Sequence, residues 1–490
     1  MRLKETLFRL SRKKGLVFAG KAAYSLWARL VSLYFRITPE IRSVYLAGSM
    51  SGGDIIPGLS DIDFVIVVRG LDSKYEYQFL KNLEEKLRYM LPPFGKDKIG
   101  THVIVYTAGE WAILGDIFQG KKSGSPLALF DKDVITFTNR FGPALKALHH
   151  YYKAHWRLEM IEQNIVDPPI NDYELRLKER LLERCLRSIL NGIEENDLNT
   201  NHSNLLSESK HEIEELLRKS AELGSDGLHP AILSRLLHFF DLATNGNVFP
   251  GEYLYEGMGT NERPSTTEEN GNTDKDRLKR VQDISNVLRN DIVNFPVLYC
   301  PYNNTDYFVY DLSRYHITEK LIGHYRRNNE LSFRILSKSR CDNLYFVFQE
   351  SSARFTCLGD NKQYLLKVGL DNDRIILESY TLFPQLRSLI NSRDPIRYKA
   401  FHEKARKLIS LIESRIPSGG RHTASTKEEV RDLESSRYDG SEYERFTNLR
   451  EISDILRDKI NSFLESNNNS MRASRTTHTG TSVPGGLPPE

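Results

Sequence analysis

Cysteine is scarce in this chain of 490 residues, with four in all. None of them forms a Cys-X-X-Cys pair, and no histidine cluster accompanies them, which argues against a zinc site or a disulfide framework. Scattered thiols of this kind are typical of a reducing compartment, so we expect a cytoplasmic protein. The four residues are Cys185, Cys300, Cys341 and Cys357.

Long uncharged apolar runs are also missing. The stretch 16–37 is the most apolar near the N-terminus, but Lys21, Arg29 and Arg36 interrupt it, and a membrane span needs about 20 residues without such breaks. The stretch also lacks the clean apolar centre and the small-residue cleavage site of a signal peptide. We therefore predict amphipathic helices over residues 1–40 that pack on the following domain, with contact to a membrane surface as the alternative.

An excess of charge of one sign is the third absence. Lys and Arg number 68 and Asp and Glu 65, for a formal net charge of +3. This balance gives no strong signal for nucleic-acid binding and argues against a polymerase or a tRNA-modifying enzyme. Hydrophobic residues make up 39% of the chain, enough for sizeable cores, and the length favours two to four domains.

Residues 41–140 alternate between short apolar strands and a helix. A Gly- and Pro-rich loop at 51–60 separates the first two strands. Apolar residues at helical spacing follow the second strand and end at a pair of prolines. This order predicts a compact α/β core with a mixed sheet. The expected elements are strands at 43–47, 61–68 and 101–106 and a helix at 75–90.

Composition divides the rest of the chain. Helical periodicity predicts a helical domain, and a polar stretch without large apolar residues predicts a linker after it. Short strand-like runs and a helix then indicate a second α+β domain, so the fold class is α+β throughout. The predicted boundaries are 141–256 for the helical domain, 257–276 for the linker, 277–416 for the C-terminal α+β domain, 417–441 for a second linker, 442–466 for a charged helix and 467–490 for a disordered tail.

One motif carries chemistry: Gly48-Ser49, eleven further residues, and then Asp61-Ile62-Asp63. In a strand, residues i and i+2 share a face, so Asp61 and Asp63 would project together. Two carboxylates so placed repel each other unless a cation lies between them, and Mg²⁺ or Mn²⁺ suits oxygen ligands and phosphates. Gly48 would let the backbone approach a phosphate, and Ser49 would add a hydroxyl at the start of a helix.

The segments Leu46-Ala47-Gly48-Ser49 and Ser60-Asp61-Ile62-Asp63-Phe64 resemble the signature of the DNA polymerase β-type nucleotidyltransferase superfamily. That superfamily includes antibiotic-modifying adenylyltransferases, toxin-antitoxin enzymes and tRNA-end-adding enzymes. The resemblance covers about residues 42–106. It implies transfer of a nucleoside monophosphate from a nucleoside triphosphate such as ATP to an acceptor hydroxyl on a small molecule or protein.

The same resemblance implies roles for single residues. Asp61 and Asp63 would be catalytic and would bind the metal ion, and Gly48, Ser49 and Ser60 would bind the triphosphate. The helical segment 141–256 would close over the acceptor, as a helical domain does in the antibiotic-modifying relatives.

The sequence departs from the superfamily pattern at the third carboxylate, which usually lies on the neighbouring strand. His102 aligns there; it is a poor Mg²⁺ ligand but a capable general base. Asp97 before the strand and Glu110 after it are the other candidates. A second hypothesis follows, in which the fold is catalytically decayed and binds nucleotide or a partner as a regulatory protein. The sequence does not identify the acceptor, the nucleotide or the oligomeric state.

Overall fold

The computed structural model describes most of the chain between residues 5 and 478, in which it forms two compact units. Unit 1 comprises Met1–Phe8, Gly120–Lys122 and Gly142–Arg374, and unit 2 comprises Arg9–Gln119, Ser123–Phe141 and Ile375–Glu490. The described residues are 5–6, 8–9, 13, 16–51, 55–91, 98–99, 101–118, 127–131, 136–164, 171–195, 203–223, 228–244, 255–257, 273–293, 297–302, 305–310, 315–327, 332–336, 352–359, 363–367, 370–392, 394–416 and 441–478.

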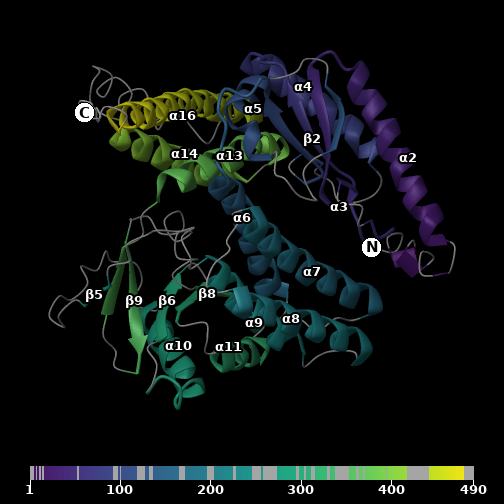
Figure 1. The fold of residues 1–490 in the computed structure, drawn as a ribbon. Coiled ribbons are helices and arrows are strands. Elements are labelled where there is room, and N and C mark those ends of the chain that lie inside the picture. The colour runs from purple at the N-terminus through teal and green to yellow at the C-terminus, as the bar shows by residue number, and fades with distance from the viewer. Residues whose placement is uncertain are drawn as a thin grey trace, which may run out of the picture. The chain divides into compact units, whose positions relative to one another are not determined.

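Unit 2 is built on a four-stranded sheet with the order β3-β2-β1-β4. Figure 1 shows β2 in this sheet, with α4 and α2 nearby. Strand β2 pairs with β3 in parallel and with β1 antiparallel, and β4 is antiparallel to β1, so the sheet is mixed as predicted. Together with the helices, it confirms the α+β class. The strands are β1 (Ile41–Ala47), β2 (Asp63–Val68), β3 (Val103–Thr107) and β4 (Leu127–Asp131).

Strand β2 forms the centre of the unit because its apolar run leaves no polar face. Every residue from Phe64 to Val68 is fully buried, as expected for a strand covered on both sides. Helix α4 (Ser73–Met90) provides the crossover that the parallel β2–β3 pair requires. It begins at Asp72, whose carboxylate accepts from the Tyr75 backbone N–H at 2.9 Å, an ordinary N-cap.

The helix predicted near the N-terminus is α2 (Leu16–Ile37), which packs beside the sheet. One of its faces buries Ala28, Val31 and Phe35, and the Phe35 ring meets that of Phe64 edge to face at 5.3 Å. Among the described residues, no helix is both long enough and apolar enough to cross a membrane.

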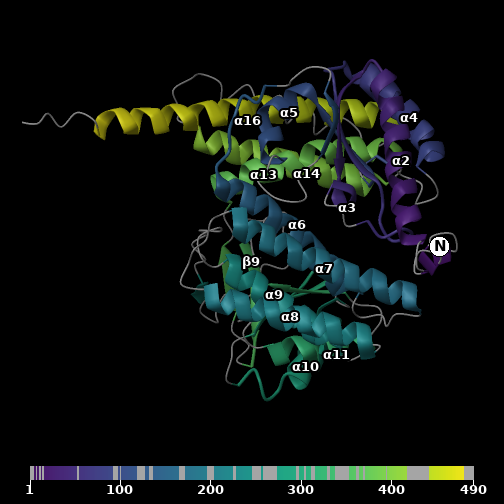
Figure 2. The ribbon, with the colours of Figure 1, turned by 45° about the vertical axis from the view of Figure 1, so that its right-hand side comes forward.

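Three helices from the C-terminal part of the chain complete unit 2. They are α13 (Asn372–Ser388), α14 (Pro395–Arg415) and α16 (Glu442–His478), and both views show α14 running along α16 (Figures 1 and 2). In α16, the buried residues Phe446, Leu449, Ile452, Leu456 and Ile460 form one apolar stripe at helical spacing.

This arrangement differs from the boundaries predicted from sequence. We expected 277–416 to form one domain and 442–466 to stand apart as a charged helix. The chain instead changes units between Arg374 and Ile375, and α16 belongs to the core of unit 2. The many charged residues of α16 had led us to expect a solvent-exposed helix, although one of its faces is apolar and buried. The helix also continues to His478, into the predicted tail at 467–490. Residues 479–490 lie outside the described part.

Unit 1 combines helices with a six-stranded sheet of order β5-β10-β9-β6-β7-β8. Helices α6 (Pro143–Asn164), α7 (Asp172–Glu195), α8 (Ser203–Leu223) and α9 (Leu228–Thr244) occupy the stretch predicted to be helical. Of the predicted linkers, 258–272 and 417–440 lie outside the described residues, and Thr273 already belongs to α10. The other elements are β5 (Tyr255–Gly257), α10 (Thr273–Val287), β6 (Val297–Tyr302), β7 (Thr305–Val309), α11 (Tyr315–Arg327), β8 (Ser332–Leu336), β9 (Ser352–Leu358) and β10 (Gln363–Lys367).

Candidate functional site

The two halves of the predicted motif meet where β1 ends. The antiparallel pairing of β1 and β2 sets Ala47 opposite Asp63, so Gly48 lies directly beside the Asp63 side chain. Gly48 adopts a φ of 65°, a left-handed conformation that favours glycine. A Cβ added to Gly48 would collide with Oδ2 of Asp63. Glycine is therefore required here both by its backbone angle and by the carboxylate beside it.

We expect Gly48→Ala to lower the free energy of unfolding by about 1–3 kcal/mol, because it adds backbone strain and a clash with Asp63. Urea unfolding measures the change. Gly109→Ala in α5 (Ala108–Leu114) is the matched control, because a Cβ there meets nothing closer than 3.8 Å and alanine favours a helix. Equal losses in the two variants would contradict the assigned conformation.

Ser49 is the second residue of α3 (Gly48–Ser51), a single helical turn. Its hydroxyl is buried and has no hydrogen-bond partner among the described residues. A buried hydroxyl without a partner is uncommon, because its desolvation is not offset. Ser49 therefore has an unused hydrogen-bonding group beside Gly48, as a residue that awaits a ligand would have.

Ser60 is buried too, but its oxygen already has a partner. It accepts from the Ile56 backbone N–H at 2.8 Å and so closes the turn that leads into β2. The Gly58 N–H in the same turn donates to the Tyr24 hydroxyl of α2 at 3.0 Å. Ser60 thus shapes the loop that carries Asp61.

Asp61 and Asp63 lie at the start of β2, and both are partly exposed. We expected Asp61 on the strand, but the strand begins at Asp63. Asp61 therefore belongs to the preceding loop. Nδ1 of His102 lies 3.5 Å from Oδ1 of Asp63. The sheet thus brings His102, the residue aligned with the third carboxylate, against one member of the acidic pair.

A buried carboxylate of α4 binds the backbone just before His102. Glu84 accepts from the backbone N–H groups of Lys98 and Ile99 at 2.8 and 2.7 Å. The Lys98 carbonyl in turn accepts from the N–H of His102 at 2.9 Å. His102 therefore follows a fixed turn. Glu84 had given no sign of this role in the sequence, because its partners are backbone groups 14 and 15 residues away.

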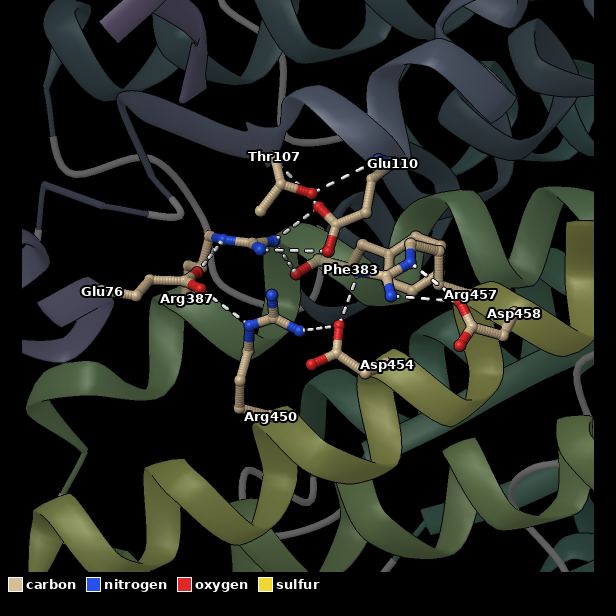
Figure 3. Close-up of polar contacts among 9 residues, drawn as sticks. All are labelled: Glu76, Thr107, Glu110, Phe383, Arg387, Arg450, Asp454, Arg457 and Asp458. Carbon is tan, nitrogen blue, oxygen red and sulfur yellow. Dashed lines mark hydrogen bonds and ion pairs between the residues drawn. The ribbon is translucent and has the colours of Figure 1, made fainter. Parts of the chain in front are cut away.

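Glu110, one of the alternatives to His102, is engaged elsewhere. It occupies the third position of α5, where its side chain accepts from the Thr107 N–H at 2.9 Å in a capping box. Arg387 of α13 holds both of its oxygens, at 2.9 and 3.0 Å (Figure 3). Glu110 is thus a structural carboxylate and no longer a candidate metal ligand. Asp97, the other alternative, lies outside the described residues.

Glu110 belongs to a buried charge cluster that we define as Glu76, Glu110, Arg387 and Arg450 (Figure 3). Glu76 of α4 accepts from Arg387 at 2.8 Å and from Arg450 of α16 at 2.7 Å. Burial alone would raise the pKa of Glu110, but the charges of Arg387 and Arg450 outweigh it and hold that pKa below the usual value. The stabilisation it contributes is therefore present at neutral pH and is lost as the pH falls below about 4.5.

In the part of the chain that the structure describes, no group of three or more His, Cys, Asp or Glu side chains is placed to hold a metal ion. Asp61 and Asp63 do offer the carboxylate oxygens that Mg²⁺ prefers. They are partly exposed, and Asp63 lies beside Gly48, the residue before Ser49. The motif thus supplies two carboxylates of the kind that binds a divalent cation, and His102 lies against one of them.

Comparison with known proteins adds one match. The family model described as a nucleotidyltransferase domain matches residues 33–108, from the end of α2 to the start of α5. The match contains Gly48, Ser49, Ser60, Asp61, Asp63 and His102, whereas Glu110 and Arg387 lie outside it. Neither a curated protein nor a solved structure matches the chain.

Proposed function

We propose, from the nucleotidyltransferase domain of the polymerase β type at residues 33–108, that this protein transfers a nucleoside monophosphate from a nucleoside triphosphate to an acceptor hydroxyl. The acceptor is a small molecule or a protein side chain. The observation that carries the proposal is the meeting of Gly48, Ser49 and Asp63 at the end of β1.

The triphosphate would bind at the turn between β1 and α3. Gly48 has no side chain, so its backbone can approach a phosphate closely. The buried Ser49 hydroxyl would donate to a phosphate oxygen and so gain the partner it lacks. Asp61 and Asp63 would hold a divalent cation, which when bound offsets the negative charge that develops on the departing pyrophosphate.

His102 would act on the acceptor. Nδ1 of the imidazole lies 3.5 Å from Asp63, and the ring would accept the proton of the attacking hydroxyl. The turn held by Glu84 keeps the ring in place relative to β2. A histidine in this position would supply the basic group that a third carboxylate supplies in the superfamily.

One observation favours a second candidate function. Glu110 forms an ion pair with Arg387. Among the described residues, no third carboxylate is placed with Asp61 and Asp63 to bind a metal ion. A domain with this deficit would bind nucleotide without transferring it, and would then serve as a nucleotide-sensing or partner-binding protein.

Incubation with α-labelled nucleoside triphosphates, Mg²⁺ or Mn²⁺ and a cell extract tests the two functions against each other. Transfer activity predicts label on an acceptor, and His102→Ala should reduce turnover while His211→Ala, an exposed histidine of α8, leaves it unchanged. Nucleotide binding without label transfer would support the second function. Absence of both binding and transfer would overturn the two together.

A further inference from the structure

Helix α2 is fixed in its rotation by contacts on one side. The Trp27 indole N–H donates to the Met90 carbonyl at 2.6 Å, and the Tyr24 hydroxyl accepts from Gly58. The same side buries Ala28, Val31 and Phe35. The residues on the other side of α2 are therefore directed outward by the fold.

The outward side of α2 is apolar, although a helix face exposed to water usually carries polar residues. Its outer stripe consists of Leu26, Leu30, Leu33 and Ile37, which are 60%, 47%, 54% and 79% exposed. Their spacing of four, three and four residues places them in one row along the helix. Phe18 is exposed beside it, and none of the described residues covers the row. A helix that is apolar on two faces needs a second apolar environment.

The charged residues of α2 itself are all positive. Helix α2 carries Lys21, Arg29 and Arg36 and no acidic residue. Arg29 and Arg36 lie four residues before and three after Leu33, so they flank the stripe on the helix surface. Residues 1–37 contain nine basic and one acidic side chain, or +8 against +3 for the whole chain, which leaves −5 for all the rest. Positive charge is thus concentrated at this end.

We propose that α2 is an interfacial anchor for an anionic phospholipid bilayer. The outer stripe enters the boundary between headgroups and acyl chains, and Arg29 and Arg36 contact lipid phosphates. A second copy of the chain suits the surface less well, because a pair of α2 helices would bring arginines together with no acidic residue to offset them. The anchor does not depend on the proposed nucleotidyl transfer.

Co-sedimentation of the full-length protein with vesicles tests the anchor. Vesicles of phosphatidylcholine with phosphatidylserine should carry the protein down, and phosphatidylcholine alone should carry much less. Leu30→Gln with Leu33→Gln should weaken binding by about tenfold or more. Arg29→Gln with Arg36→Gln should remove the preference for phosphatidylserine. Ile37→Gln should weaken binding, while Ile396→Gln, an equally exposed isoleucine of α14 (73%), should not.

Circular dichroism spectra that match the wild type would show that the variants fold. Absence of sedimentation with phosphatidylserine vesicles would overturn the proposal, as would binding that the leucine substitutions leave unchanged. Light scattering measures the oligomeric state of the wild type and of the leucine variant in solution. A dimer in solution that Leu30→Gln and Leu33→Gln convert to a monomer would assign the outer stripe to a second copy and refute the lipid anchor.

Discussion

Replacing Arg387 with methionine should lower the free energy of unfolding of unit 2 by about 3–5 kcal/mol. The guanidinium is fully buried and binds two carboxylates, Glu76 and Glu110, that are themselves buried. Methionine fills a similar volume but leaves Glu110 charged and without its main partner in a region that excludes water. The cost of a buried, unpaired charge exceeds the net value of the ion pair, and so the loss is large.

Urea unfolding in a Trp27→Phe, Trp156→Phe background measures this loss through Trp111, which is buried beside Tyr106 in unit 2. Arg69→Met is the matched control. Arg69 is partly exposed and lies 3.9 Å from Glu40, so its removal should change the free energy by less than about 1 kcal/mol.

Should the Arg387→Met variant fail to fold, adding Glu110→Gln should recover part of the stability. The neutral amide removes one of the charges that lost its partner. Equal stability of Arg387→Met and wild type would show that the cluster does not hold α13 against α4 and α5.

Asp61→Asn and Asp63→Asn should each lower metal-dependent nucleotide binding or transfer by orders of magnitude and leave folding nearly unchanged. Both side chains are partly exposed, and two neighbouring carboxylates repel each other when no cation is present. An amide of the same shape relieves that repulsion but removes a metal ligand. A structural pair would lose stability with or without metal, because its hydrogen bonds would be broken.

Thermal melts with and without Mg²⁺ and a nucleoside triphosphate distinguish the two cases. The wild type should be stabilised by the ligands together, because they bind the folded state, and both variants should lose that gain. Asp458→Asn on the surface of α16 is the control and should retain it. A wild type without any ligand-dependent shift, together with variants that melt much lower, would show that the pair is structural.

The sequence alone predicted three of the four strands of the sheet and missed β4 (Leu127–Asp131). The apolar run of β2 and the break at Gly48 are local signals, and the pairing of β1 with β2 follows from their order. The resemblance aligned His102 with the third carboxylate; in the structure His102 directly precedes β3, and its Nδ1 lies 3.5 Å from Oδ1 of Asp63. The family match at residues 33–108 confirms the type of domain.

Features that depend on distant partners could not be predicted. From the sequence, Glu110 was a reasonable third metal ligand. In the structure it is hydrogen-bonded to Arg387, which lies 277 residues away in the chain. The helical spacing of α16 is as consistent with a free charged helix as with a packed one, and only the burial of Phe446 and Ile452 decides between them. Asp61 lies off the strand because Ser60 closes a turn just before it, which residue types do not specify.

The long separation between Glu110 and Arg387 also matters while the protein is being made. A ribosome adds roughly 5–20 residues per second, so roughly 14–55 s pass between the synthesis of the two residues. During that interval α13, α14 and α16 are missing, and Glu76 and Glu110 have no cationic partner from α13 or α16. The whole of unit 1 between residues 142 and 374 is translated in the meantime. Unit 2, whose sheet is translated first, is therefore completed last.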